Sequence, residues 1–321
     1  NADALFLTAI DPYGHELWRW TFPVNKLNQQ TEQLSPLSSR PAYTETENEL
    51  TVKANKRTFI FSKKDGQLKG VSVDNRKINF ANGPRFIGAR RADRSLDQFY
   101  NHDDEKAKEK DRTYSEFPDA AVFTKLDVKE DGGNLVVTAN YKLGNLDKAQ
   151  WTINPSGELA LDYTYNFSGV VDLMGIRFDY PEDQVISKRW LGAGPYRVWQ
   201  NRIHGTQYDV WENDYNDPIP GETFTYPEFK GYFGDVSWMN IQTKEGTISL
   251  TNETPDAYIG VYQPRDGRDR LLYTLPESGI SVLNVIPPVR NKVNSTDLCG
   301  PSSQPKWVNG PQTGRVIFRF M

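Results

Sequence analysis

The sequence predicts an all-β fold, a large antiparallel sandwich with long loops. Its clearest strand pattern covers residues 159–167, where apolar and polar side chains alternate strictly. Five apolar or aromatic side chains fall on one face of this segment: Leu159, Leu161, Tyr163, Tyr165 and Phe167. Evidence for helices is thin. The charged segment 103–112 has no apolar stripe, so any helix there would be short and exposed.

The other predicted strands are short segments bounded by turn residues. They cover residues 58–61, 135–142, 236–241, 247–250, 282–286 and 315–320. Turn pairs such as Asp65-Gly66, Glu245-Gly246 and Asn309-Gly310 lie between or beside them. Many short strands in a chain of 321 residues favour a large sandwich.

Composition divides the chain into three parts. Residues 1–24 alternate in polarity and end in an aromatic cluster, which predicts one or two strands. Residues 25–48 are rich in Asn, Gln, Ser, Thr and Glu, with Pro36 and Pro41, and predict a linker. Residues 49–321 form the predicted main domain, so the first part belongs to a different unit.

The bulk numbers exclude several classes of function. The formal net charge is -4 and the charges are interspersed, so the chain lacks the basic field that attracts nucleic acid. No apolar run approaches the roughly 20 residues that cross a bilayer, so no membrane contact is expected. The single cysteine, Cys299, cannot form an intrachain disulfide. The three histidines are far apart, so neither a metal site nor a cofactor is expected.

Two turn-rich segments, residues 82–103 and 190–217, do not fit a plain β core. Residues 190–202 combine glycines, a proline, arginines and tryptophans. Tryptophan and tyrosine beside turns offer flat apolar faces with a polar edge, which suit the C–H faces and hydroxyls of sugars. We therefore expect a concave, sugar-contacting surface here. The acidic residues 213–217 with Glu222 lack the spacing of a calcium loop and predict a solvated loop.

Three polar residues of this segment are candidate sugar ligands. Arg197, Asn201 and Arg202 carry donors suited to hydroxyls and carboxylates. They could face a sugar pocket, or they could pair with Glu212 or Asp214 in a structural network. The residue types leave both interpretations open.

The aromatic residues of the same segment have two interpretations as well. Trp199, Trp211 and Tyr215 could form a sugar-facing cluster, although aromatic side chains in β proteins more often pack in the core. The turn at residues 192–195 could bring the backbone close to a ligand, or it could turn a corner of the sandwich.

These motifs resemble a known family in their order and spacing. Residues 65–68 (Asp-Gly-Gln-Leu), 82–86 (Asn-Gly-Pro-Arg-Phe) and 91–93 (Arg-Ala-Asp) resemble the opening of the C-terminal domain of glycoside hydrolase family 2 β-galactosidases. Residues 190–195 (Trp-Leu-Gly-Ala-Gly-Pro) resemble its Gly-x-Gly-Pro motif. The resemblance spans residues 49–321, and residues 4–22 resemble the last strands of the immunoglobulin-like domain that precedes it.

The resemblance implies a galactose-mutarotase-like supersandwich and an accessory role. In this family two catalytic glutamates lie in a barrel domain, so the resemblance places the catalytic residues outside this chain, which alone would be inactive. The parent protein would be a β-galactosidase-like hydrolase. The chain departs from the family after the Gly-Pro, where Tyr196–Trp199 replaces Glu-Asn-Tyr and Asn201-Arg202 replaces Asp-Arg.

The resemblance also suggests one further aromatic contact. Near its end the family domain has a Gly-rich loop with a tryptophan that stacks on sugar, and residues 299–307 occupy a similar place. Trp307 is therefore expected in a loop that contacts sugar. The expected partners are a galactoside-like carbohydrate, the catalytic barrel domain of the same parent chain and further copies of the chain. Ca²⁺ or Mg²⁺ would belong to the parent enzyme, since nothing in this chain supports them.

Other functions stay open on the sequence. The chain could be an autonomous carbohydrate-binding module, or a structural domain that mediates oligomer contacts. It could also be a mutarotase-like epimerase that uses His204 with Glu212 or Glu228 as acid and base. Low cysteine use suits the cytoplasm, whereas polysaccharide degradation suits the periplasm or secretion.

Overall fold

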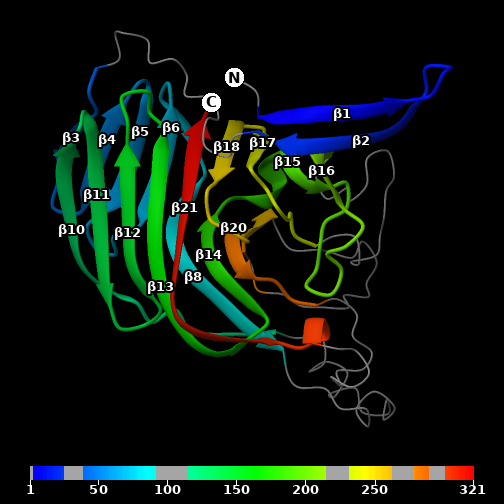
Figure 1. Ribbon diagram of the computed structural model, residues 1–321. Coiled ribbons are helices and arrows are strands. Elements are labelled where there is room, and N and C mark those ends of the chain that lie inside the picture. Colours follow the sequence, from blue (N-terminus) through cyan, green and yellow to red (C-terminus); the bar gives the residue numbers. More distant parts are fainter. Residues whose placement is uncertain are drawn as a thin grey trace.

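The computed structural model describes residues 3–24, 39–91, 114–214, 231–261, 276, 278–288 and 301–321. Within them the chain forms two large antiparallel sheets and a separate two-stranded hairpin (Figure 1). The prediction of a large antiparallel all-β supersandwich is confirmed. No helix in the described part of the chain is long and apolar enough to cross a membrane.

The first sheet has nine strands among the described residues. In spatial order they are β10 (Val122–Asp131), β11 (Asn134–Lys142), β12 (Leu146–Ile153), β13 (Leu159–Val171), β21 (Lys306–Phe320), β18 (Gly246–Asn252), β17 (Trp238–Thr243), β15 (Val185–Gly194) and β16 (Gln207–Asp214). Its longest ladder joins β13 to β21, from Leu159↔Phe318 to Val171↔Lys306. The C-terminal strand therefore lies at the centre of this sheet.

The second sheet contains ten strands of the described residues. Its main path runs through β19 (Tyr258–Val261), β20 (Ile280–Val285), β14 (Leu173–Asp179), β8 (Ala81–Arg91), β6 (Leu68–Val73), β5 (Arg57–Ser62), β4 (Glu49–Ala54) and β3 (Ala42–Glu45). β7 (Arg76–Ile78) pairs with β6, and β9 (Tyr114–Glu116) pairs with β8. The described residues also form the short 3-10 helices η1 (Glu182–Gln184) and η3 (Pro301–Ser303).

Apolar side chains from both sheets form the main core. Every apolar residue predicted on one face of residues 159–167 is buried, because alternation turns that whole face of β13 inward. The ring of Trp151 lies 6.0 Å from those of Phe61 and Phe178. A smaller core cluster on the other side of the second sheet includes Ile87 and Trp199.

Two predicted boundaries move. Residues 42–45, inside the predicted linker 25–48, form the edge strand β3. They do so because the backbone N–H and C=O groups of β4 on that side are available to pair with them. Residues 82–91 of the predicted turn-rich segment 82–103 belong to the eleven-residue strand β8. The charged segment 103–112, where any helix was expected to be short and exposed, lies outside the described residues.

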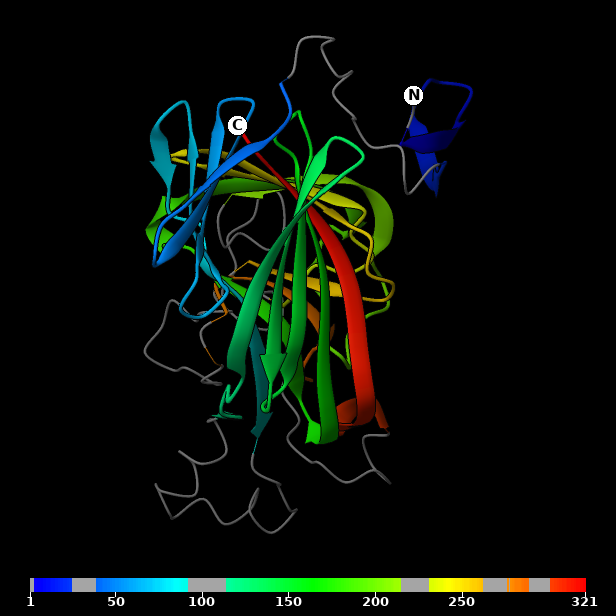
Figure 2. The same cartoon turned by 90° about the vertical axis from the view of Figure 1, so that its left-hand side faces the viewer.

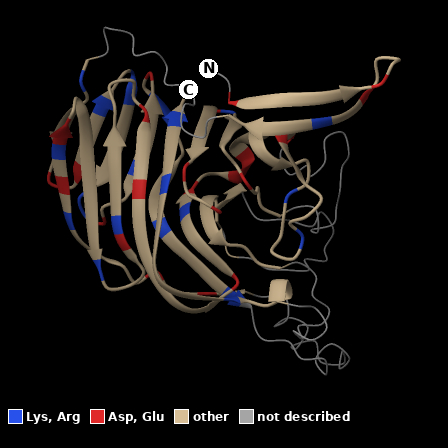
Figure 3. Ribbon diagram, in the orientation of Figure 1, with Lys and Arg blue, Asp and Glu red and all other residues tan. Residues whose placement is uncertain are grey.

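The N-terminal segment forms the hairpin of β1 (Ala4–Ile10) and β2 (Glu16–Pro23), as predicted. It stands apart from the two sheets in the rotated view (Figure 2). Charged side chains are interspersed along both sheets, whereas the hairpin carries few of them (Figure 3). Its contacts with the main body include an ion pair of 3.8 Å between Arg19 and Asp209 of β16.

Candidate functional site

The candidate site is the loop of residues 195–206, which connects β15 to β16. The two strands pair from Ser187↔Asp214 to Gly194↔Gln207, so the loop begins and ends at the same edge of the sheet. Its entry is the cis peptide bond Gly194-Pro195. A tight turn follows, in which the Arg202 N–H donates to the Trp199 carbonyl at 2.8 Å.

This loop lines an open pocket of about 510 Å³. The wall consists of residues 196, 197, 200–204 and 206, with Ser302 from η3. Three of the predicted sugar ligands, Arg197, Asn201 and Arg202, thus line one cavity. The volume is within the range of about 300–1,000 Å³ that is typical of small-molecule sites.

The three polar residues differ in burial. Arg197 is only 3 % exposed, and its guanidinium carbon lies 5.6 Å from the centroid of the Phe233 ring, which stabilises the cation. Asn201 is half-buried and Arg202 is exposed at the rim. The pocket therefore has one buried charge in its wall, Arg197, and one exposed charge at its rim, Arg202.

Gln200 connects the loop to the C-terminal segment. Its Nε2 donates to the carbonyl oxygens of Ser302 at 2.9 Å and Gln304 at 2.7 Å. Its backbone N–H donates to the Pro287 carbonyl at 3.1 Å. Sequence reasoning missed Gln200 and Ser302, because their contact joins segments about a hundred residues apart and leaves no local pattern.

The predicted role of Trp199 as a sugar platform is not supported. Its side chain is 1 % exposed and packs edge-on against Tyr232, with ring centroids 5.7 Å apart. The neighbouring Val198 exchanges two backbone hydrogen bonds with Tyr232, which holds this part of the loop against the core. Trp199 therefore packs in the core beneath the loop, and its ring is not accessible for stacking on a ligand.

Trp211 also lies outside the pocket wall. It is half-buried in β16, and its indole N–H donates to the Gln207 carbonyl at 3.1 Å. The ring lies over Gly194, where an added Cβ would come within 2.4 Å of Trp211 Cδ1. The glycine of the Gly-Pro motif thus makes room for Trp211.

Trp307 is 71 % exposed, as a ligand-stacking residue would be. It lies in β21, opposite Val170, and not in the predicted loop. The extended ladder of β13 continues past Gly310, whose φ of +95° permits the strand to bend there. Trp307 does not line the pocket, and Tyr215, the third residue of the predicted aromatic cluster, lies outside the described residues.

The described residues hold no set of groups recognisable as an acid–base or metal centre. His204 lines the pocket, and no carboxylate of the described residues is hydrogen-bonded to it; Glu228 falls outside them. Glu212 is exposed, and its Oε2 lies 3.9 Å from Arg189 Nε. No three His, Cys, Asp or Glu side chains of the described ranges gather in a way that could hold a metal ion.

We expect Gly194→Ala to lower the free energy of unfolding by about 1–3 kcal/mol, because the new methyl group overlaps the Trp211 ring. Urea denaturation measures the change. In a Trp211→Ala background the same substitution should cost much less, since the obstructing ring is gone. An equal cost in both backgrounds would show that the overlap is not the cause.

Comparisons with known proteins identify the family. The model of the β-galactosidase small chain family matches residues 53–287. No curated protein sequence matches the chain. Among solved structures, a galactose 1-epimerase from Lactobacillus acidophilus NCFM aligns with a TM-score of 0.43 and 9 % identity, over 88 % of this chain and 99 % of that one. A GalM/aldose epimerase homologue from C. elegans aligns with a TM-score of 0.36 and 8 % identity, over 88 % and 99 %. Because the family model covers more than half of the sequence, the chain belongs to the β-galactosidase small chain family.

Proposed function

We propose that the chain is the C-terminal accessory domain of a β-galactosidase-like family 2 glycoside hydrolase. It forms one wall of the sugar-binding pocket and supports assembly with a catalytic barrel domain, whose two glutamates lie outside this chain. The observation that carries the proposal is the convergence of Arg197, Asn201 and Arg202 on one cavity, in a chain of this family.

The chemistry of the pocket suits a sugar. Guanidinium and amide groups donate to hydroxyl oxygens in fixed directions. Tyr196 lies at the rim, partly exposed, and combines an apolar ring with a hydroxyl. Because Gln200 fixes the loop to η3, the donors are held in place before a ligand arrives.

The hairpin supports the assembly part of the proposal. Leu5↔Phe22, Leu7↔Trp20 and Ala9↔Trp18 are cross-strand pairs, so these six side chains share one face. The five large ones among them are 44–59 % exposed. An isolated two-stranded hairpin is marginally stable, and a contiguous apolar face marks an interface. We infer that this face packs against the other strands of an immunoglobulin-like domain of the parent protein.

The proposal is tested by assaying the chain with p-nitrophenyl β-D-galactoside. We expect no turnover above the uncatalysed rate, because a retaining glycosidase needs two carboxyl groups about 5–5.5 Å apart and the proposal places both elsewhere. Polarimetry of freshly dissolved α-D-galactose should likewise show no accelerated mutarotation. Turnover in the first assay would refute the accessory role, and acceleration in the second would establish an epimerase.

Binding separates the accessory role from an autonomous carbohydrate-binding module. The exposed ring of Trp307 is the observation that favours the module. An accessory wall predicts millimolar or weaker affinity for galactose in titration calorimetry, whereas a module predicts micromolar affinity that is lost in Trp307→Ala.

We expect Arg202→Gln to weaken galactose binding about tenfold, because it removes a charged donor at the rim while leaving the core intact. The matched control is Lys129→Gln, an exposed cation of β10 that lies away from the pocket. Calorimetry of both variants measures the change. A loss of affinity in the control as large as that in Arg202→Gln would contradict the assignment of the pocket.

A further inference from the structure

The pocket at the loop of residues 195–206 contains an amide oxygen without a partner. Gln200 lines this pocket and is only 6 % exposed. Its Oε1 is buried and accepts no hydrogen bond from the described residues. A buried polar atom that stays unpaired costs free energy, so each one in a folded protein needs an explanation. Beside a cavity, such an atom indicates a hydrogen bond that a ligand completes.

The amide nitrogen of Gln200 fixes the orientation of this oxygen. Nε2 carries two protons and donates to the carbonyl oxygens of Ser302 at 2.9 Å and Gln304 at 2.7 Å. The backbone N–H of Gln200 donates to the Pro287 carbonyl at 3.1 Å. Exchanging the amide oxygen and nitrogen would place one acceptor against two others, so the carboxamide has a single favourable orientation. Oε1 is therefore a fixed acceptor that cannot rotate to find a partner.

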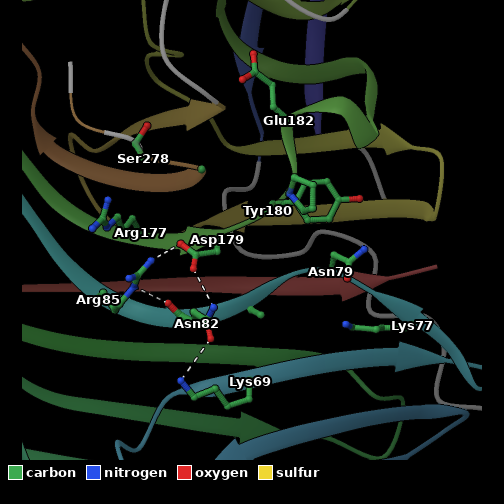
Figure 4. Close-up of a pocket in the computed structure, with 13 residues that line it drawn as sticks. Lys69, Lys77, Asn79, Asn82, Arg85, Arg177, Asp179, Tyr180, Glu182 and Ser278 are labelled. Carbon is green, nitrogen blue, oxygen red and sulfur yellow. Dashed lines mark hydrogen bonds and ion pairs between the residues drawn. The ribbon is translucent and has the colours of Figure 1, made fainter. Parts of the chain in front are cut away.

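A second polar cavity, of about 770 Å³, provides a contrast. It lies on the other large sheet, where Arg85 of β8 and Arg177 of β14 are opposed cross-strand partners. Arg85 forms an ion pair with Asp179, and Asn82 Nδ2 donates to Asp179 Oδ2 at 2.9 Å. Asn82 Oδ1 in turn accepts from Lys69 Nζ at 3.4 Å, which completes the chain of contacts in Figure 4. The amide oxygen of this cavity thus has a partner, unlike that of the loop.

The rest of the loop pocket supplies many donors and few acceptors. Arg197 and Arg202 carry only donors, and no carboxylate is among the described residues that line the pocket. The hydroxyl of Thr206 donates to the Ile203 carbonyl at 3.2 Å. A sugar hydroxyl that accepts from a guanidinium still has a proton to donate. The oxygen of Gln200 can accept that proton, so one hydroxyl would connect the donors of the wall to its acceptor.

We propose that Gln200 Oε1 accepts the proton of one galactose hydroxyl and thereby selects sugars that carry this hydroxyl. The inference rests on the proposed function, in which the loop contacts a galactoside, and it assigns a specificity-determining residue within that site. A deoxy sugar presents a C–H group at the same position and leaves Oε1 unpaired. Sites built to hydrogen-bond a hydroxyl reject the analogue that lacks it for this reason.

The test compares D-galactose with its 2-, 3-, 4- and 6-deoxy derivatives. Amide shifts of the ¹⁵N-labelled whole chain give a dissociation constant for each sugar. We expect one of the deoxy sugars to bind at least about tenfold more weakly than galactose, because it cannot complete the buried hydrogen bond. If all four bound as tightly as galactose, the proposal would be overturned.

Two substitutions of Gln200 attribute this penalty to its oxygen. Gln200→Leu removes the acceptor, so the tenfold penalty should fall to about twofold or less, as in a cycle that deletes both partners of one contact. Gln200→Glu keeps an acceptor oxygen and should keep the penalty. Both substitutions remove the Nε2 donors to Ser302 and Gln304. The matched control, Gln312→Leu at an exposed position of β21, should leave every affinity unchanged.

The possible results distinguish this proposal from the function on which it rests. If galactose shifts no amide of residues 196–206, the proposed function fails and the acceptor role fails with it. If galactose binds there but Gln200→Leu retains the full penalty, only the acceptor role is refuted. Loss of the penalty in Gln200→Glu as well as in Gln200→Leu would show that attachment of the loop is the cause, which also refutes the acceptor role.

Discussion

Replacing Trp151 by alanine is expected to lower the free energy of unfolding by about 3–5 kcal/mol. Trp151 of β12 is fully buried between the two sheets. Its ring contacts Phe61 of the second sheet at 6.0 Å and Phe178 of the same sheet at 6.0 Å, measured between centroids. Truncation removes these contacts and leaves a cavity that rigid strands on both sides cannot close. Urea denaturation monitored by circular dichroism measures the loss.

Trp151→Phe is the matched control. The indole N–H of Trp151 is buried without a hydrogen-bond partner among the described residues. Phenylalanine keeps most of the packing and removes that N–H. The free-energy cost of burying the unpaired N–H is therefore absent in this variant, which offsets part of the lost packing. We expect the phenylalanine variant to lose less than half of what the alanine variant loses. Similar losses in both would mean that the aromatic contacts do not carry the stability.

Gly175→Ala is expected to cost about 3 kcal/mol, the upper part of the range for overpacked sites. Gly175 lies in β14 opposite Leu283 of β20, beside an irregularity in the register. A Cβ there would come within 2.2 Å of the Val282 carbonyl oxygen and 2.7 Å of Leu283 Cα. Both are backbone atoms, so relief requires the two strands to separate. Urea denaturation again provides the measurement.

Gly70→Ala is the control for this glycine. Gly70 also lies within a strand, β6, but the nearest atom to its added Cβ is Ile60 Cδ1 at 4.0 Å. Alanine should fit there and stabilise the chain slightly, by up to about 1 kcal/mol, because it restricts the unfolded state. If both variants lost stability equally, close backbone approach would not explain the role of Gly175.

The strands could be predicted from the sequence because their signal is local. Alternation over residues 159–167 alone determines which face of β13 is buried, and the structure confirms it. The end of β21 shows the limit of such reasoning. Pro305 and Asn309-Gly310 are typical of a loop, but pairing with β13 extends the strand back to Lys306. Partner strands distant in sequence override local turn signals.

The candidate site was predictable in part for the same reason. Arg197, Asn201 and Arg202 were identified because they cluster within six positions of one loop. The burial of Trp199 depends on the bridge between Val198 and Tyr232, which no local pattern contains. The opposed pair of Arg85 and Arg177 arises from the register of β8 against β14 and is equally invisible in the sequence.

Sugar contact by the loop of residues 195–206 is the central feature of the proposed function. The direct measurement is a titration of the ¹⁵N-labelled chain with D-galactose, followed by its amide chemical shifts. We predict progressive shifts in residues 196–206 and in 301–304, which Gln200 joins to the loop, with none in β10, β11 and β12. Shifts confined to other parts of the chain, or no shifts at all, would contradict the claim.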